Sequence, residues 1–110
     1  MIRLAKPPST NSLYRNRRGG RAKTKVYSAW LEAASWQVKV QKPKRVEGKC
    51  AVTIRVEKRG RVKEDIDNRI KSVLDLLVAT DVIEDDRNVW RVTAEWADVS
   101  GCEVEVKPYD

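Results

Sequence analysis

The feature that most constrains the fold is a change in the spacing of apolar residues in the middle of the chain. From Lys49 to Glu57 apolar and polar residues alternate, which is the period of a strand with one buried face. After a charged segment, apolar residues recur at steps of three and four, as on a helix: Ile70, Val73, Leu74, Leu77 and Val78. A strand followed by an amphipathic helix predicts a sheet with helices packed against it.

Similar patterns predict the remaining elements. The expected strands cover residues 1–5, 49–57, 89–96 and 102–107, and the expected helices cover 26–42 and 67–78. We therefore predict an α+β fold in the order β-α-β-α-β-β, a single domain over residues 1–110 with a mixed sheet of about four strands and two helices. Thr24 or Ser28 is expected to cap the first helix.

The chain has no histidine and only two cysteines. Cys50 and Cys102 fall on alternating apolar positions, so we expect both in the core rather than in a zinc site. Without histidine there is no Ser-His or Cys-His nucleophile pair, and hydrolysis must rely on carboxylates, lysine or metal-bound water. No apolar run is long enough to span a bilayer and no signal-peptide core is evident, so we expect a cytoplasmic protein without membrane contact.

The net charge of +7 is unevenly distributed. Residues 1–49 carry a net +11, whereas residues 50–110 carry a net −4. A basic half of this kind supplies affinity for nucleic-acid phosphates. Two alternatives remain open at this point: the charge serves only solubility, or the basic half pairs with the acidic half.

Two cationic segments are the candidate DNA-binding residues. Residues 13–25 contain adjacent glycines and much like charge, which predicts a mobile loop that orders on a phosphate backbone, with Tyr14 free to stack on a base; the alternative is a solvated flexible arm. A second run lies directly before the main acidic cluster. The candidates are Arg15, Arg17, Arg18 and Arg21 in the first segment and Lys58, Arg59, Arg61 and Lys63 in the second.

The acidic cluster is the candidate catalytic site. Asp65 and Asp67 are two residues apart, so in an extended segment they leave the same face and suit one divalent cation. A short helix returning over the sheet is expected to bring Asp86 toward them, and a set of carboxylate oxygens favours Mg²⁺ or Mn²⁺, which polarises a phosphate and activates water. The alternative is that Asp67 only caps a helix while Asp65 is solvated.

Lys71 lies one turn after Asp67 on the predicted helix. A cation at this position is suited to stabilise the charge that develops on a phosphate under attack. The alternative is an ordinary ion pair with Asp67 or Asp75, four residues away on either side.

At these positions the chain resembles the RusA-type Holliday junction resolvases. It follows the family pattern D-x-D-N-x-x-K-x-x-x-D-x-L and then v-i-x-D-D without any change in spacing, and it also has a start like P-P-S-x-N-x-x-Y-R. The matching segments are Asp65-Ile66-Asp67-Asn68, Lys71, Asp75-Leu76-Leu77, Val82-Ile83-Glu84-Asp85-Asp86, Pro7-Pro8-Ser9-Thr10-Asn11 and Tyr14-Arg15.

The resemblance implies a Mg²⁺-dependent endonuclease that acts on branched DNA, specifically four-way junctions, as a homodimer and without a small-molecule cofactor. By position it makes Asp65, Asp67 and Asp86 the essential acidic residues and Lys71 the essential lysine. Thr80-Asp81 departs from the family, which commonly has a glycine-containing turn there. This leaves open whether Asp85 or Asp86 reaches the metal, and Asp86 is preferred.

Two other functions remain open from the sequence: a noncatalytic DNA-binding module, and a metal nuclease for flaps, forks and other branched DNA. A junction is resolved by two symmetric nicks, yet one chain carries a single carboxylate cluster, so two chains are expected. The expected dimer surface is the apolar part of the second helix, namely Ile70, Val73, Leu74, Leu77 and Val78.

Overall fold

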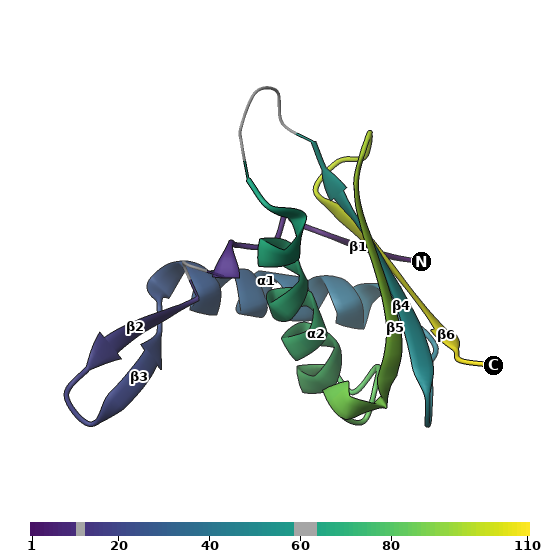
Figure 1. Ribbon diagram of the computed structural model, residues 1–110, viewed down its shortest axis with the longest axis horizontal. Coiled ribbons are helices and arrows are strands. Elements are labelled where there is room, and N and C mark those ends of the chain that lie inside the picture. Colours follow the sequence, from purple (N-terminus) through teal and green to yellow (C-terminus); the bar gives the residue numbers. More distant parts are fainter. Residues whose placement is uncertain (11–12, 59–63) are drawn as a thin grey trace.

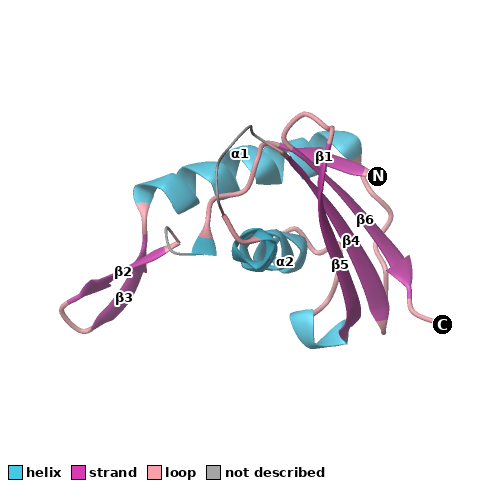
Figure 2. Ribbon diagram, turned by 45° about the horizontal axis from the view of Figure 1, so that its top comes forward, coloured by secondary structure: helices cyan, strands magenta, loops and turns pink. Residues whose placement is uncertain are grey.

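The computed structural model describes residues 1–10, 13–58 and 64–110. The main sheet is flanked on one side by the two helices, while its other face is open to solvent (Figures 1 and 2). Across the sheet the strands follow the order β1 (Ile2–Leu4), β6 (Cys102–Pro108), β4 (Cys50–Glu57) and β5 (Val89–Ala97). β6 is antiparallel to β1 and β4, whereas β4 and β5 are parallel, so the predicted mixed α+β architecture is confirmed.

The alternating pattern of β4 determines which of its faces is buried. Cys50, Val52, Ile54 and Val56 are buried, and the residues between them are partly exposed. Cys102 on β6 is buried opposite this strand, as predicted. Burial raises the pKa of the Cys102 thiol to about 12, so it stays protonated and packs as a small apolar group.

Helix α1 (Lys25–Gln41) begins and ends where the sequence predicts. The Thr24 hydroxyl accepts a hydrogen bond from the Tyr27 backbone N–H at 3.2 Å, which is an N-cap. The helix ends at Lys42, which adopts a left-handed conformation with φ of 49° just before Pro43. Every third or fourth residue of one face is buried in the core: Tyr27, Trp30, Ala34 and Val38.

Helix α2 (Ile70–Ala79) begins three residues later than predicted. A single 3₁₀ turn, η2 (Ile66–Arg69), precedes it, and Asp67 lies inside this turn. No side chain caps either η2 or α2, so the interpretation of Asp67 as a helix cap is wrong. The buried face of α2 consists of Ser72, Val73, Leu76 and Leu77.

The basic segment after Leu13 is a hairpin and not the predicted loop. β2 (Tyr14–Arg17) and β3 (Gly20–Lys23) form an antiparallel ribbon that projects from the body of the molecule (Figure 1). Gly19 supplies the positive φ, 87°, that the tight turn requires. The ribbon has few apolar residues to bury, so the alternation that identifies other strands is absent.

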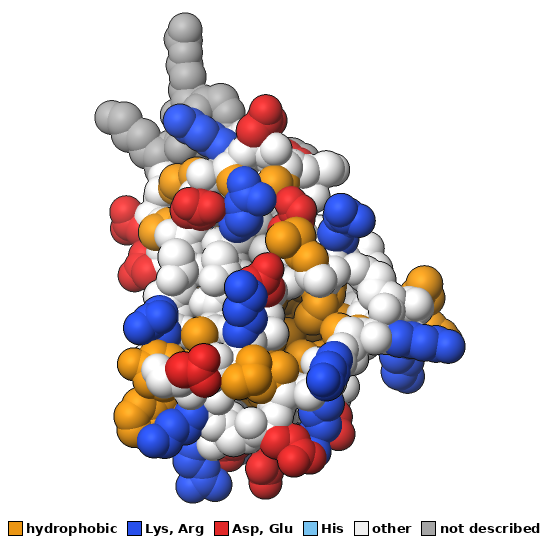
Figure 3. Space-filling view, turned by 90° about the vertical axis from the view of Figure 1, so that its right-hand side faces the viewer, with side chains coloured by type: hydrophobic (Ala, Val, Ile, Leu, Met, Phe, Trp, Pro, Cys, Tyr) orange, Lys and Arg blue, Asp and Glu red, His pale blue; other side chains and the backbone are white. Residues whose placement is uncertain are grey.

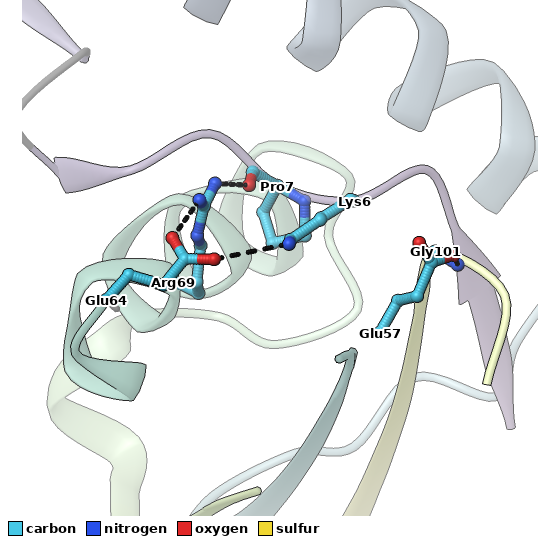
Figure 4. A network of polar contacts seen from close by, with 6 residues as sticks. All are labelled: Lys6, Pro7, Glu57, Glu64, Arg69 and Gly101. Carbon is cyan, nitrogen blue, oxygen red and sulfur yellow. Dashed lines mark hydrogen bonds and ion pairs between the residues drawn. The ribbon is translucent and has the colours of Figure 1, made fainter. Parts of the chain in front are cut away.

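The turn between β5 and β6 lies close to the first strand. Gly101 has φ of 71°, and a Cβ there would overlap the Leu4 carbonyl oxygen. Its N–H donates to Glu57 Oε1 at 2.9 Å (Figure 4). A glycine is therefore required here to close the sheet. Among the helices that the structure describes, none has the length and apolarity needed to cross a bilayer.

Candidate active site and DNA-binding surface

The first two predicted metal ligands lie where the chain leaves the sheet and enters α2. Asp65 directly precedes η2 and Asp67 is its second residue. Both side chains are exposed, and within residues 1–10, 13–58 and 64–110 no cation pairs with either carboxylate. Two exposed carboxylates, without an ion-pair partner among the described residues, therefore sit two residues apart between β4 and α2, in an arrangement that can bind a hard divalent cation.

Asp86 lies at the opposite end of α2. β5 runs parallel to β4, with Val89 beside Cys50, so the turn η3 (Asp86–Asn88) is near the start of β4 while Asp65 follows its end. Figure 1 shows η3 at the C-terminal end of α2 and η2 at its N-terminal end. The ten residues of α2 correspond to about 15 Å.

This separation overturns the expectation that the returning helix brings Asp86 to Asp65 and Asp67. A metal ion is bound by oxygens at about 2–2.6 Å, so one ion cannot span the length of the helix. Accordingly, the described part of the chain contains no group of three side chains placed to hold a metal together. A single chain carries a pair of carboxylates at one end of α2 and Asp86 at the other.

The neighbouring carboxylate, Asp85, has a structural role in the turn. Its Oδ1 accepts a hydrogen bond from the Arg87 backbone N–H at 3.0 Å, and its Oδ2 lies 3.4 Å from Arg87 Nε. The backbone N–H of Arg87 is the main reason that the pKa of Asp85 is lowered. Asp85 therefore caps η3, and Asp86 is its exposed neighbour in the same turn.

Lys71 is held in a short chain of polar contacts. Its Nζ lies 3.6 Å from Asp75 Oδ1, and the other carboxylate oxygen of Asp75 accepts a hydrogen bond from the Tyr27 hydroxyl at 2.7 Å. Burial and the neighbouring Asp75 raise the pKa of Tyr27, so the phenol remains a protonated donor. The Lys71 side chain is 52% exposed, so it can bind a substrate phosphate while Asp75 holds it near the start of α2.

A second polar network joins the N-terminal motif to the carboxylate turn (Figure 4). Arg69 pairs with Glu64 and donates from Nη1 to the Pro7 carbonyl at 2.5 Å, and Lys6 Nζ lies 3.3 Å from Glu64. The hydrogen bond from Arg69 is the main reason that the pKa of Glu64 lies below its ordinary value. The sequence spacing did not indicate this network, since Lys6 and Pro7 lie about half the chain away from Glu64 and Arg69.

The four arginines of the first cationic segment all lie on the β2–β3 hairpin. Each is exposed, and no carboxylate of the described residues pairs with any of them. Tyr14 is not free to stack on a base. Its ring packs edge-on against that of Tyr27, with 5.8 Å between the ring centroids, and the guanidinium carbon of Arg21 lies 5.3 Å from the Tyr14 centroid. Of the second segment, Lys58 is exposed after β4, while Arg59, Arg61 and Lys63 lie outside the described residues.

The apolar surface predicted for dimerisation is only partly available. Val73 and Leu77 are fully buried in the core, so that part of the prediction is wrong. Ile70, Leu74 and Val78 are partly exposed and recur every four residues along α2. On β5, which forms one edge of the sheet, Val92 is 39% exposed on the same side as the helices.

Comparison with known proteins identifies the family. Residues 5–107 match the model of the family described as Endodeoxyribonuclease RusA. The match includes the N-terminal motif, both carboxylate segments and the basic hairpin. None of the curated proteins matches the chain significantly. Because the matched region covers nearly the whole chain, the protein is an endodeoxyribonuclease of the RusA family.

Proposed function

We propose that this nuclease resolves four-way DNA junctions by a pair of symmetric, Mg²⁺-dependent nicks in DNA recombination and repair, and that it acts as a homodimer in the cytoplasm. The observation that carries the proposal is the separation of the carboxylates by the length of α2. A single chain carries two of the proposed ligands at one end of α2 and the third at the other end, so neither end has a complete metal site. Two such chains related by a two-fold axis complete both.

The proposed dimer packs the two α2 helices against each other in opposite directions. Asp86 of each chain then lies beside Asp65 and Asp67 of its partner, and the two completed sites are about one helix length apart. The partly exposed row on α2, formed by Ile70, Leu74 and Val78, supplies apolar surface for this contact. Two equivalent sites in matched orientation suit two symmetric cuts in a four-armed substrate.

The donor set fits Mg²⁺ or Mn²⁺. Asp65, Asp67 and the partner's Asp86 offer only carboxylate oxygens, and among the described residues no protein cation neutralises the pair within a chain. When bound, the ion would supply Lewis-acid polarisation of the scissile phosphate and activation of a water molecule. The same proposal treats residues 1–110 as one domain. The N-terminal motif is joined to the carboxylate turn, because Arg69 pairs with Glu64 and also donates to the Pro7 carbonyl.

The other residues of the chain hold the substrate. Lys71, fixed by Asp75, provides a positive charge next to the carboxylate turn, where negative charge develops on the phosphate. The hairpin arginines Arg15, Arg17, Arg18 and Arg21, together with Lys58, Arg59, Arg61 and Lys63, bind the phosphates of the junction arms. In a dimer both hairpins contribute to the same substrate, which raises the affinity without new types of contact.

The proposal is tested with a labelled synthetic four-way junction and a linear duplex of the same sequence, each with and without Mg²⁺. We expect paired symmetric nicks in the junction only, and only with the metal. Asp67→Asn should abolish cleavage and leave binding intact, because it removes a ligand charge with little change in shape. The matched control is Asp98→Asn, an exposed carboxylate in the β5–β6 turn, which should cut normally.

Three outcomes contradict parts of the proposal. Binding without cleavage under all conditions would identify a noncatalytic DNA-binding module. Equal cleavage of flaps or forks would indicate a nuclease with broader specificity. Normal cleavage by Asp67→Asn at saturating Mg²⁺ would show that this carboxylate is not a ligand.

A further inference from the structure

An exposed cluster of aromatic and cationic side chains lies where β4 and β5 begin. We call it the Trp90 cluster; its members are Lys49, Trp90, Arg91 and Tyr109. The Trp90 indole is 58% exposed, and Lys49 Nζ lies 4.0 Å from its ring centroid. The Tyr109 ring is 5.9 Å from that of Trp90, and Arg91 lies over Tyr109 at 5.1 Å. Two neighbouring rings are therefore flanked by two cations on one surface.

The backbone holds this surface in place without burying it. The register between β4 and β5 shifts between Cys50 and Ala51, so that Trp90 is an extra residue on its strand. The Tyr109 N–H donates to the Lys49 carbonyl at 2.9 Å, which fixes the second ring beside the first. At the lower end of the solvent-facing side of the sheet, Figure 3 shows hydrophobic side chains beside several Lys and Arg side chains.

The two cations of the cluster have no ion-pair partner in the described ranges 1–10, 13–58 and 64–110. In the part of the chain that the structure describes, neither Lys49 nor Arg91 forms an ion pair with a carboxylate. Their neighbour Lys107, by contrast, pairs with Glu105 at 2.9 Å. Cations that are positioned only by ring faces keep their charge available for an anionic ligand.

We propose that the Trp90 cluster binds DNA at unpaired or unstacked bases, with Trp90 stacking on a base and with Lys49 and Arg91 binding the adjacent phosphates. Stacking on an exposed ring is tolerant of sequence, because every base presents a π face, and flanking cations follow the backbone. The location rests on the proposed function: Trp90 is the second residue of β5, which directly follows the turn that holds Asp86, so the cluster lies at the same end of the sheet as the proposed shared metal site, on the face away from the helices. Bases near a branch point are where stacking is most readily broken.

The chain offers a matched control for this surface. Trp36 on α1 is 62% exposed and has Lys39 at 5.2 Å from its ring, so it resembles Trp90 in exposure and in charge. It has no second ring beside it among the described residues. If exposed tryptophans bind single strands without any specific arrangement, both positions will contribute equally.

The test measures binding in EDTA, where metal-dependent cleavage cannot occur, to a single-stranded oligothymidine, to a four-way junction and to a blunt duplex. We expect Trp90→Ala to weaken single-strand binding about ten-fold and junction binding by a similar factor, with little change on the duplex. Trp90→Tyr should restore most of the affinity, and Trp36→Ala should bind all three as wild type does. Lys49→Ala and Arg91→Ala should each lower the salt slope on the single strand by roughly 0.7.

Two results overturn the proposal. Unchanged affinity of Trp90→Ala for all three ligands would assign the cluster to protein contacts, and an equal loss on duplex and single strand would show that it only binds phosphates. Circular dichroism and thermal melting confirm that each variant is folded. Because no metal is present, failure of this test leaves the proposed cleavage untouched, and a failure of junction cleavage would leave these affinities unchanged.

Discussion

Mixing two inactive variants tests whether each metal site is shared between chains. In a dimer of one Asp67→Asn chain and one Asp86→Asn chain, one shared site loses both carboxylates while the other keeps Asp65, Asp67 and the partner's Asp86. Random pairing of equal amounts makes half of the dimers mixed, and each has one of two sites intact. The mixture should therefore recover about one quarter of the wild-type rate of strand nicking, although each variant alone is inactive.

The assay follows the first nick in a labelled junction at saturating Mg²⁺, after the two variants have been unfolded and refolded together. The products should be predominantly singly nicked, because a mixed dimer cuts one strand. The control mixes Asp67→Asn with Asp65→Asn, which lie at the same end of α2 and leave no shared site intact. If the first mixture were as inactive as the control, the carboxylates could not be shared in this way, and a rearrangement within one chain would be needed to bring Asp86 across the length of α2.

Three further predictions follow from the packing and the charge of the fold. Gly101→Ala should lower the free energy of unfolding in urea by about 2 kcal/mol or more, because the positive φ and the Leu4 carbonyl both oppose a Cβ, whereas Gly48→Ala, with similar φ but open space, should lose about 1 kcal/mol. Tyr27→Phe should cost about 1 kcal/mol at pH 7, because the hydrogen bond to Asp75 is removed. The pKa of Tyr27 is higher in the folded protein than in the unfolded chain. The stability that the Tyr27 phenol contributes is therefore complete below pH 10 and is lost as the pH rises beyond it. In alkaline denaturation, the free energy of unfolding should fall more steeply for wild type than for the variant. The four hairpin arginines are Arg15, Arg17, Arg18 and Arg21. Replacing them by alanine should leave folding unchanged and reduce the slope of log K for DNA binding against log salt by roughly 0.9 for each phosphate that is no longer bound. An unchanged slope would exclude the hairpin from the DNA interface.

The sequence predicted those elements that separate a buried face from an exposed one. The strict alternation from Cys50 to Glu57 became β4 within one residue, because every second side chain had to reach the core. Helix α1 was equally well predicted, since its cap and its left-handed end are local features. The β2–β3 hairpin was missed because a ribbon that projects into solvent buries too little to leave an apolar pattern.

The arrangement of the site could not be predicted in the same way. The residue pattern gives Asp65, Asp67 and Asp86 their places in the chain, but their separation depends on the direction of β5. An antiparallel strand would have begun beside the end of β4, whereas the parallel strand begins beside its start, at the far end of α2. A strand–helix–strand order usually makes the two strands parallel, so this separation follows from the order of the elements, but periodicity and spacing within each element do not reveal it.

The separation of the carboxylates by the β4–α2–β5 crossover also affects how nuclease activity depends on protein concentration. With shared sites, a solitary chain is unable to cut DNA, and in dilute solution the rate rises with the square of the protein concentration. At low concentration, isolated chains would thus not cleave DNA until the concentration is high enough for them to dimerise. The crossover would serve as a threshold against unwanted strand breaks, with no inhibitor required.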